Sequence, residues 1–202
     1  MPTAYLDAEW LSRPSTEVAP ELIGCLLVRQ LPDQTILRGL IVETEAYTPN
    51  DPAMHAYRRR TARNQVIFGA AGHAYIYRIY GSYHCLNIVT DQENTASSVL
   101  IRALQLESIP DWIDAARAAK PNRIAAGPSK LCLALQIDLS LNGTLLQPGE
   151  PLWLEPRRAE EPYKIALVQT TRIGLTQGVE LPQRWYLSGC PAVSKTVRLR
   201  ST

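Results

Sequence analysis

The sequence predicts a single α+β domain, spanning residues 1–202, in which most strands pair in antiparallel fashion. A chain of 202 residues with 46% hydrophobic and 20% charged residues has the size and composition of one compact globular unit. Short runs rich in β-branched and aromatic residues alternate with turn residues, which is typical of strands joined by tight connections. There is no internal repeat, and proline and glycine punctuate turns without forming a long linker.

The N-terminal part is predicted to form one short helix followed by two strands. Ser15 or Thr16 can cap the helix, which is expected to run through Ile23 and to end at the glycine that follows. The two strands, joined by a polar turn at residues 32–34, are expected over residues 25–30 and 36–46.

Residues 74–89 are predicted to form a β-hairpin. Aromatic and β-branched residues flank a central Gly81-Ser82 pair, which is a strong turn signal. Tyr80 is then expected at the tip of the hairpin, where its own sheet offers it little to pack against.

The remaining elements complete a mixed α+β layout. Apolar residues at helical spacing predict a helix over residues 109–119, and proline in a first turn predicts another over 127–136. Further strands are expected at residues 98–106, near Leu152, and at residues 165–170 and 185–187.

The net charge is only +2, but the basic residues are unevenly distributed. Three stretches without any carboxylate, residues 52–90, 115–137 and 181–202, hold 13 of the 21 lysines and arginines. If these stretches meet on one face, that face suits a polyanion such as a nucleic acid. The alternative is that each run is simply a solvated surface.

Cysteine and histidine usage gives no support for a metal site or a cofactor. The four cysteines lie far apart without a Cys-x-x-Cys pair, so buried, reduced thiols are expected. Neither a dinucleotide fingerprint nor a nucleophile elbow is present. The first residues lack a basic, apolar leader, and no apolar run reaches membrane-spanning length, so an intracellular protein of the cytoplasm or nucleoid is expected.

Two carboxylates on one predicted strand are the strongest candidates for chemistry. Alternation along the strand places Glu43, Glu45 and Tyr47 on one face. On pattern alone this is the solvated face of an antiparallel strand. A carboxylate beside a basic surface could instead act as a general base that activates water next to a polyanionic substrate.

Two other features suit contact with nucleic acid. An exposed aromatic such as Tyr80 at a basic hairpin tip can serve as a wedge or a stacking platform for bases. The Gly127-Pro128-Ser129-Lys130 segment offers backbone N–H groups and a cation at a helix start, which can hold a phosphate but is equally compatible with an ordinary helix start.

Several strings together closely resemble the alkyladenine (3-methyladenine) DNA glycosylase family of the mammalian type. The resemblance runs in order over most of the chain, from about Leu22 to Ser194. The strings that carry it are residues 41–47 (IVETEAY), His55, residues 61–64 (TARN), 77–83 (YRIYGSY) with Asn87-Ile88, 100–104 (LIRAL), 127–131 (GPSKL) and 188–194 (SGCPAVS).

The resemblance implies a curved, mainly antiparallel sheet with flanking helices and a protruding hairpin that intercalates into the DNA minor groove. It also implies roles for residues by position. These are Glu45 as the base that activates water, Arg102 near that water, Tyr47, His55 and Tyr77 lining the pocket for a flipped base, Asn87 screening against the guanine amine, and Tyr80 as the wedge. From the basic stretches and the helix start, Arg63, Arg78, Ser129 and Lys130 are expected as further DNA contacts.

The expected activity is hydrolysis of the N-glycosidic bond of alkylated or deaminated purines, of the 3-methyladenine, 7-methylguanine and hypoxanthine class, after base flipping. The expected partner is double-stranded DNA that contains such a base, bound by a monomeric, cofactor-free enzyme without strand cleavage or membrane contact. Two alternatives stay open: a non-catalytic nucleic-acid-binding module, which makes no use of Glu45, and a small-molecule nucleoside hydrolase, which makes no use of the basic surface.

Overall fold

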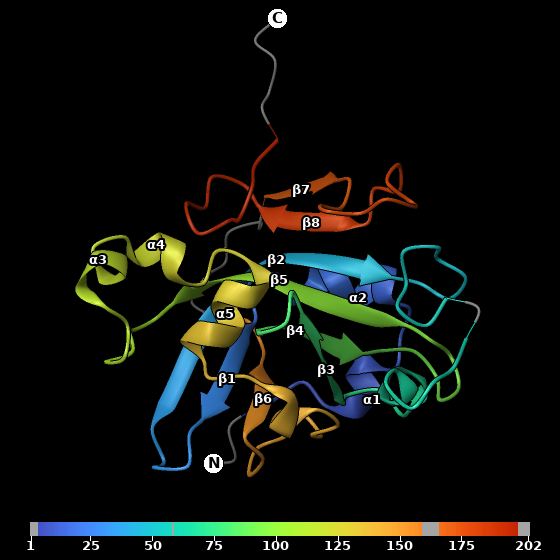
Figure 1. Ribbon diagram of the computed structural model, residues 1–202, viewed down its shortest axis with the longest axis horizontal. Helices are drawn as coiled ribbons and strands as arrows, with labels where there is room; N and C mark the ends of the chain where they lie inside the picture. The colour runs from blue at the N-terminus through green and yellow to red at the C-terminus, as the bar shows by residue number, and fades with distance from the viewer. Residues whose placement is uncertain (1–3, 58, 159–165, 198–202) are drawn as a thin grey trace, which may run out of the picture.

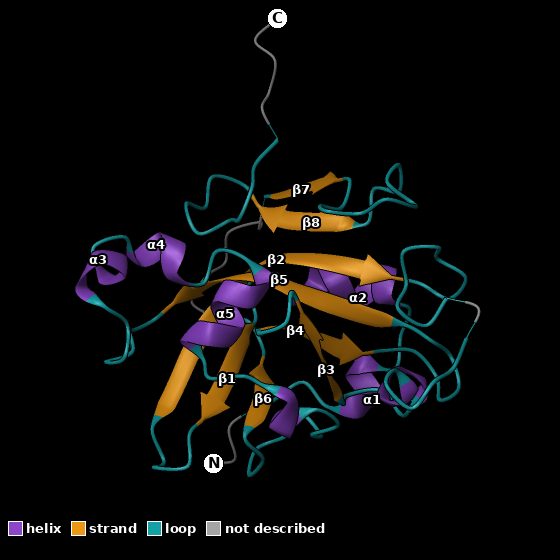
Figure 2. Ribbon diagram, in the orientation of Figure 1, coloured by secondary structure: helices purple, strands orange, loops and turns teal. Residues whose placement is uncertain are grey.

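The computed structural model describes residues 4–57, 59–158 and 166–197, and in them one curled antiparallel sheet organises the chain (Figures 1 and 2). Its strands follow the spatial order β3-β4-β5-β2-β1-β6, and a second pair, β7 and β8, joins through β8 to β2. The strands are β1 (Leu26–Gln30), β2 (Ile36–Tyr47), β3 (Ala74–Ile79), β4 (Tyr83–Val89), β5 (Ser98–Leu106), β6 (Leu152–Glu155), β7 (Leu167–Thr170) and β8 (Arg184–Leu187).

Short helices flank this sheet, and those that are described are too short and too polar to cross a membrane. Helix α2 packs on β2 and α5 packs on β4 and β5, whereas α3 and α4 lie together away from the centre of the sheet (Figure 1). The helices are α1 (Ala8–Leu11), α2 (Ser15–Leu22), α3 (Ala115–Ala118), α4 (Pro121–Ile124) and α5 (Pro128–Ala134), with 3-10 turns at Gln65–Phe68 and Leu139–Leu141.

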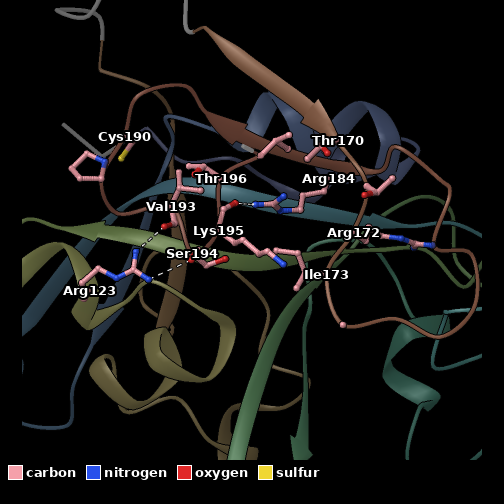
Figure 3. Close-up of a pocket in the computed structure, with 14 residues that line it drawn as sticks. Arg123, Thr170, Arg172, Ile173, Arg184, Cys190, Val193, Ser194, Lys195 and Thr196 are labelled. Atoms are coloured by element: carbon pink, nitrogen blue, oxygen red, sulfur yellow. Dashed lines mark hydrogen bonds between the residues drawn. The ribbon is translucent and has the colours of Figure 1, made fainter. Parts of the chain in front are cut away.

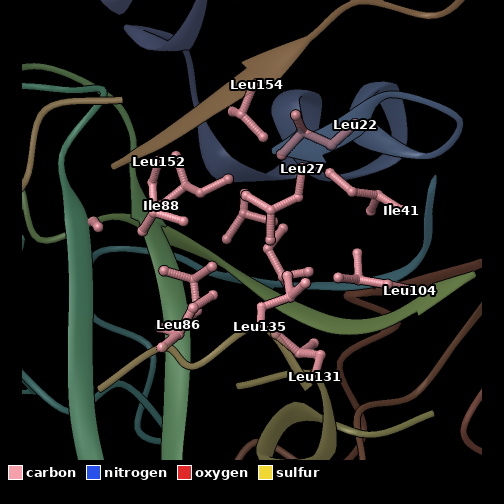
Figure 4. Close-up of a cluster of buried hydrophobic side chains, with 14 of the residues drawn as sticks. Leu22, Leu27, Ile41, Leu86, Ile88, Leu104, Leu131, Leu135, Leu152 and Leu154 are labelled. Carbon is pink, nitrogen blue, oxygen red and sulfur yellow. The ribbon is translucent and has the colours of Figure 1, made fainter. Parts of the chain in front are cut away.

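The main core lies where the curled sheet meets α2 and α5. Leu22 of α2 and Leu131 of α5 are fully buried there, together with inward residues of the strands such as Leu27, Ile41 and Leu86 (Figure 4). Burying side chains of this size removes apolar surface from water and stabilises the fold by roughly 1.5–3 kcal/mol each.

Strand β2 is the longest strand and the one that positions the two candidate carboxylates. It pairs with β5 along one edge, while on the other edge β1 pairs with its first half and β8 pairs with Glu43, Thr44 and Glu45. The register against β5 shifts on both sides of Glu43, which marks a β-bulge. Bulges redirect side chains and are common next to active sites. The two carboxylates therefore lie between β5 and β8 in the middle of the sheet.

Most of the elements predicted from the sequence are confirmed, with ends that differ by one or two residues. Strand β5 matches its predicted range, and the hairpin forms with Tyr80 in its turn at a positive φ of 46°. Ser15 does not cap α2. Pro14 is the N-cap residue, and the Ser15 hydroxyl instead donates to the carbonyl oxygen of Tyr47 at 3.1 Å. This bond ties α2 to the end of β2.

The predicted helix over residues 109–119 is wrong. Only Ala115–Ala118 is helical, because the Asp114 carboxylate accepts the Arg117 N–H at 3.0 Å and begins a new helix there. Upstream of it, Ile109 and Trp112 are about 40% exposed. The spacing of apolar residues that favoured a longer helix therefore did not reflect a buried helical face.

Candidate active site

Glu45 is a fully buried carboxylate near the end of β2, held by three donors from three parts of the chain. Its Oε1 atom accepts the backbone N–H of Ile173 at 2.8 Å and lies 3.1 Å from Nη1 of Arg102 on β5. Its Oε2 atom accepts the hydroxyl of Tyr47 at 3.0 Å. The side chain is 0% exposed, so the solvated-face interpretation of this strand is wrong.

The hydrogen bonds around Glu45 leave room for one more donor. An ionised carboxylate has about four lone-pair positions, two on each oxygen. Ile173 occupies one position on Oε1, which also faces the charge of Arg102, and Tyr47 occupies one position on Oε2. The remaining position on Oε2 can accept a proton from a water molecule or a substrate.

The second carboxylate, Glu43, is equally buried but makes a different set of contacts. Its Oε1 atom accepts Nε of Arg102 at 3.1 Å and Nε of Arg184 at 2.7 Å, and its Oε2 atom accepts the Ser194 N–H at 2.7 Å. Two carboxylates and two guanidinium groups thus form one cluster without net charge. Since Arg102 binds Glu43 through Nε and Glu45 through Nη1, Glu43 fixes the orientation of the guanidinium group that faces Glu45.

The electrostatic environment favours a protonated Glu45 more than water does. Burial is the largest effect and raises the pKa of Glu45, and the charge of Glu43 adds to it, whereas Arg102 and the hydrogen bonds from Ile173 and Tyr47 act in the opposite direction. Burial and the neighbouring Glu45 also raise the pKa of Tyr47. Tyr47 therefore stays protonated and donates to Glu45 at neutral pH.

Aromatic rings gather beside this carboxylate. The ring centroids of His55 and Tyr77 lie 4.0 Å apart, and His55 Nδ1 is 3.1 Å from the Tyr75 hydroxyl. Tyr47 and Tyr77 pack against a small apolar cluster that contains Tyr75. Burial, helped by the charge of Arg63, lowers the pKa of His55, so this ring is neutral at physiological pH. A neutral aromatic wall can accept a cationic ring without repelling it.

Arg172 was not singled out from the sequence, yet it holds the back of the aromatic site. Its guanidinium lies 4.6 Å from the centroid of the Tyr47 ring and donates to the Ala46 carbonyl oxygen at 3.0 Å. Both of its Nη atoms contact the Asp51 carboxylate, and Nη2 also donates to the Gly178 carbonyl oxygen. Arg172 therefore fixes Tyr47 and the loop that carries the neighbouring Ile173.

Asn87 and Tyr80 occupy opposite ends of the β3–β4 hairpin. Asn87 is 3% exposed and donates through Nδ2 to the carbonyl oxygen of Tyr75, the residue that it faces across the strand pair. Tyr80 lies in the turn with 90% of its surface exposed, which is the largest value among the exposed hydrophobic residues. Asn87 is thus close to the aromatic cluster, and Tyr80 is free to contact a partner.

The basic residues predicted to bind DNA divide into exposed and buried groups. Arg63 and Arg78 are exposed and line one cleft of about 650 Å³ together with Tyr77, and Arg63 donates to the Arg78 carbonyl oxygen. Lys130 is exposed and Ser129 half-buried in the first turn of α5. Arg184 belongs to the acid-free stretch 181–202, but it is 3% exposed and bound to Glu43, so it cannot contact a phosphate.

All four cysteines are buried, as the sequence predicts, and burial raises the pKa of Cys25, Cys85 and Cys132. Among the residues that the structure describes, no three cysteine, histidine, aspartate or glutamate side chains cluster so that they could hold a metal ion. The buried donors around Glu45 instead hold one carboxylate in place, and this carboxylate can act as a proton acceptor.

The structure thus places Glu45 in contact with Tyr47 and Arg102. His55 and Tyr77 contact each other beside this group. Sequence reasoning missed the supporting residues Asp51, Arg172, Ile173 and Arg184. Ile173 contributes its backbone N–H, which leaves no signature in a side-chain pattern. The resemblance strings at residues 41–47 and 188–194 did point to one of these contacts, since the Ser194 N–H of the second string donates to Glu43 of the first.

Comparison with known protein families identifies a match over nearly the whole chain. The family described as Methylpurine-DNA glycosylase matches residues 9–191, a range that includes every residue of the contact sets around Glu45 and the aromatic rings.

Individual relatives are similar over their full length. A protein of Trichodesmium erythraeum is 56% identical over 195 residues, covering 94% of this chain and 97% of the relative. A protein of Synechococcus sp. (strain JA-3-3Ab) is 60% identical over 190 residues, covering 92% and 97%. A protein of Methanoculleus marisnigri is 44% identical over 191 residues, covering 94% and 98%. All three are provisionally named 3-methyladenine DNA glycosylase.

Proposed function

Because this chain belongs to the methylpurine-DNA glycosylase family, it is a DNA glycosylase for alkylated purines, and we propose that Glu45 activates the water that breaks the glycosidic bond. In the proposed reaction the damaged nucleotide turns out of the duplex, and its base enters the space beside Tyr47, His55 and Tyr77. Water attacks the anomeric carbon as the purine leaves, and Glu45 takes a proton from that water.

One observation supports this proposal above the others. Glu45 is a fully buried carboxylate with a raised pKa, fixed by Arg102 and Ile173 and joined through Tyr47 to the aromatic rings. A general base has to be held in place and has to keep an acceptor position for the proton that it removes. Glu43 has as many partners, but two of them are guanidinium groups that balance its charge, and it makes no contact with Tyr47; it therefore suits support better than proton transfer.

The surroundings suit a cationic leaving group. A methylated purine already carries positive charge, so it needs no proton donor, and the enzyme has mainly to place water and stabilise the positive charge that develops on the sugar. The carboxylate of Glu45 supplies negative charge at that centre, in a site from which most water is excluded. Neutral His55 and the tyrosine rings can stack on the extruded base.

The wider proposal includes hypoxanthine as a deaminated substrate, double-stranded DNA as the partner, a monomeric state, and release of the base without strand cleavage. It places the enzyme with the DNA, in the cytoplasm or nucleoid. The test is incubation with duplex DNA that carries one 7-methylguanine, followed by scoring of abasic sites before and after alkali. A binding module will produce no abasic sites, and a nucleoside hydrolase will instead cleave free 7-methylguanosine.

The pH dependence of base release is expected to report the raised pKa of Glu45. Only the carboxylate form accepts a proton, so activity increases with pH as Glu45 loses its own proton. Burial raises the pKa of Glu45 above its ordinary value of 4.5, against the opposing effect of Arg102. The single-turnover rate for 7-methylguanine should therefore reach half of its plateau above pH 4.5. A midpoint at or below pH 4.5, with the enzyme still folded by circular dichroism, contradicts this expectation.

Tyr80 is expected to act as a wedge that fills the gap left by the flipped nucleotide. Extrusion costs a few kcal/mol of stacking and pairing, part of which a stacked ring restores. Tyr80→Ala should slow excision most for a well-paired lesion, less for the same lesion in a mismatch, and least in single-stranded DNA. Tyr80→Phe keeps the ring and should be nearly normal. Equal losses on all three substrates in single-turnover assays would assign Tyr80 to the chemical step or to folding.

Asn87 is expected to select against purines with a 2-amino group. Its buried amide lies on β4 opposite Tyr75, next to the aromatic cluster. Asn87→Ser shortens the side chain and should raise the rate for guanine-type bases relative to hypoxanthine. Competition between a guanine-type lesion and hypoxanthine in single-turnover assays measures the ratio. An unchanged ratio removes Asn87 from the specificity determinants.

A further inference from the structure

A second concave region of the molecule adjoins the contacts around Glu45. It is a groove of about 830 Å³ between β7 and β8, the segment that follows β8, and α4 (Figure 3). Four of the residues that line it are cationic, and none is acidic. Its neutral polar groups include the hydroxyls of Thr170, Thr171 and Thr196. The groove therefore offers hydrogen-bond donors and positive charge to an anion.

The four cations differ in how much of their charge is already balanced. Arg172 is paired with Asp51 and Arg184 with Glu43, and both are buried. Arg123 and Lys195 are exposed and form no ion pair with any carboxylate in the described part of the chain. The positive charge available to a ligand is thus that of Arg123 and Lys195.

The backbone that carries Lys195 is held firmly on both sides. Arg123 donates to the carbonyl oxygens of Val193 and Ser194, at 3.0 and 3.3 Å. Arg184 donates to the carbonyl oxygen of Lys195 itself. With its backbone fixed in this way, Lys195 extends its side chain along the groove toward Ile173 (Figure 3).

Two residues that line the groove also bind the buried carboxylates Glu43 and Glu45. Ile173 lines the groove with its side chain and donates its N–H to Glu45. Arg184 lines it as well and binds Glu43. A DNA strand whose damaged nucleotide lies beside Glu45 has to leave the site along the surface, and a phosphodiester carries one negative charge at every nucleotide. A strand that leaves past Ile173 enters a groove free of carboxylates.

We propose that this groove holds the backbone of the damaged strand on one side of the flipped nucleotide, with Lys195 as its main phosphate contact. The inference deepens the proposed glycosylase function, on which it rests. Thr170, Thr171 and Thr196 line the same path and carry hydroxyls that can donate to phosphate oxygens, and contacts of this kind fix the register of a strand without reading its sequence. Lys195 is thus the residue that sets where the strand leaves the site.

The test compares Lys195→Gln with Arg158→Gln in the full-length protein. Arg158 is also exposed, but Glu107 already balances its charge, and it does not line the groove. Both variants lower the net charge by one. Affinity for a duplex with one lesion is measured over a range of salt concentrations. Lys195→Gln should reduce the slope of log affinity against log salt by about 0.9, the value for one lost phosphate contact, whereas Arg158→Gln should leave the slope unchanged.

A second measurement locates the contact on the DNA. Single neutral methylphosphonates are placed in turn at each phosphate around the lesion, first in the damaged strand and then in the undamaged strand. At the contacted phosphate, the neutral linkage should weaken the wild-type protein but have no further effect on Lys195→Gln. At all other phosphates the two effects should add. The expected result is coupling at one or two adjacent phosphates on a single side of the lesion.

The inference is overturned if each neutral phosphate affects binding by Lys195→Gln and by Arg158→Gln equally. It is also overturned if coupling is found only in the undamaged strand, because the groove would then belong to that strand. Its failure is separable from failure of the proposed function. If Glu45→Gln is inactive while Lys195 shows no coupling, the glycosylase mechanism stands and the groove assignment falls. If the wild-type protein releases no base while the coupling is present, the groove assignment stands and the glycosylase mechanism falls.

Discussion

Replacing Glu45 with glutamine will slow base release on the order of 100-fold or more while DNA binding is retained. The loss has this size because an amide cannot accept the proton of water, and loss of a general base removes a factor of about 10²–10⁴. Glutamine has nearly the same shape, so the contacts with Arg102 and Tyr47 can be kept. The measurement is the single-turnover rate on a duplex with one 7-methylguanine, together with affinity for the same duplex.

Folding provides the control for this variant. Because burial disfavours the charged form of Glu45, and Glu43 still pairs with both Arg102 and Arg184, the free energy of unfolding should fall less in Glu45→Gln than in Glu43→Gln. Activity close to that of the wild type, with Glu43→Gln folded but inactive, would show that Glu43 is the base.

Glu43→Gln is expected to have its largest effect on stability. The carboxylate is 0% exposed and balances Arg102 and Arg184, which are themselves 7% and 3% exposed. Its loss leaves positive charge unbalanced in the interior, and breaking a buried ion pair in this way costs about 3–5 kcal/mol. The free energy of unfolding, measured by urea denaturation, should fall by roughly that amount.

Glu155→Gln is the matched control for Glu43→Gln. Glu155 is also buried, at 8% exposure, but it lies on β6 and accepts from Arg38, whose side chain is one-third exposed to water. Water can solvate Arg38 when its partner is lost, so the cost should be about 1 kcal/mol or less. An equal fall in the free energy of unfolding in the two variants would mean that Glu43 stabilises the fold no more than a partly exposed ion pair does.

Local patterns were sufficient to predict most strands and the hairpin, because alternation and turn residues act over a few positions. The same alternation placed Glu43, Glu45 and Tyr47 on one face of β2. It could not predict that this face is buried, because the cover comes from β8, about 140 residues later in the chain. Pairing between strands so distant leaves no trace in either strand alone.

The family resemblance supplied what the local patterns could not, namely a role for each residue near Glu45. It did not supply the supporting contacts. Arg184 was interpreted as a surface cation because its neighbours in sequence are free of acids, yet its partner is Glu43 on β2. Ile173 acts through its backbone N–H, and Arg172 acts through carbonyl oxygens and a ring face. Contacts of these kinds depend on the three-dimensional fold.

The most direct test of Glu45 as the base is the pH–rate profile of Glu45→Gln beside that of the wild type. The substrate is a duplex with one 7-methylguanine, a cationic base whose departure requires no proton donor. With Glu45 as the base, the wild-type rate should rise with pH to a plateau, and the slow Glu45→Gln rate should not change with pH over the same range. A Glu45→Gln profile that keeps the wild-type rise would contradict this assignment, since another group would then be accepting the proton.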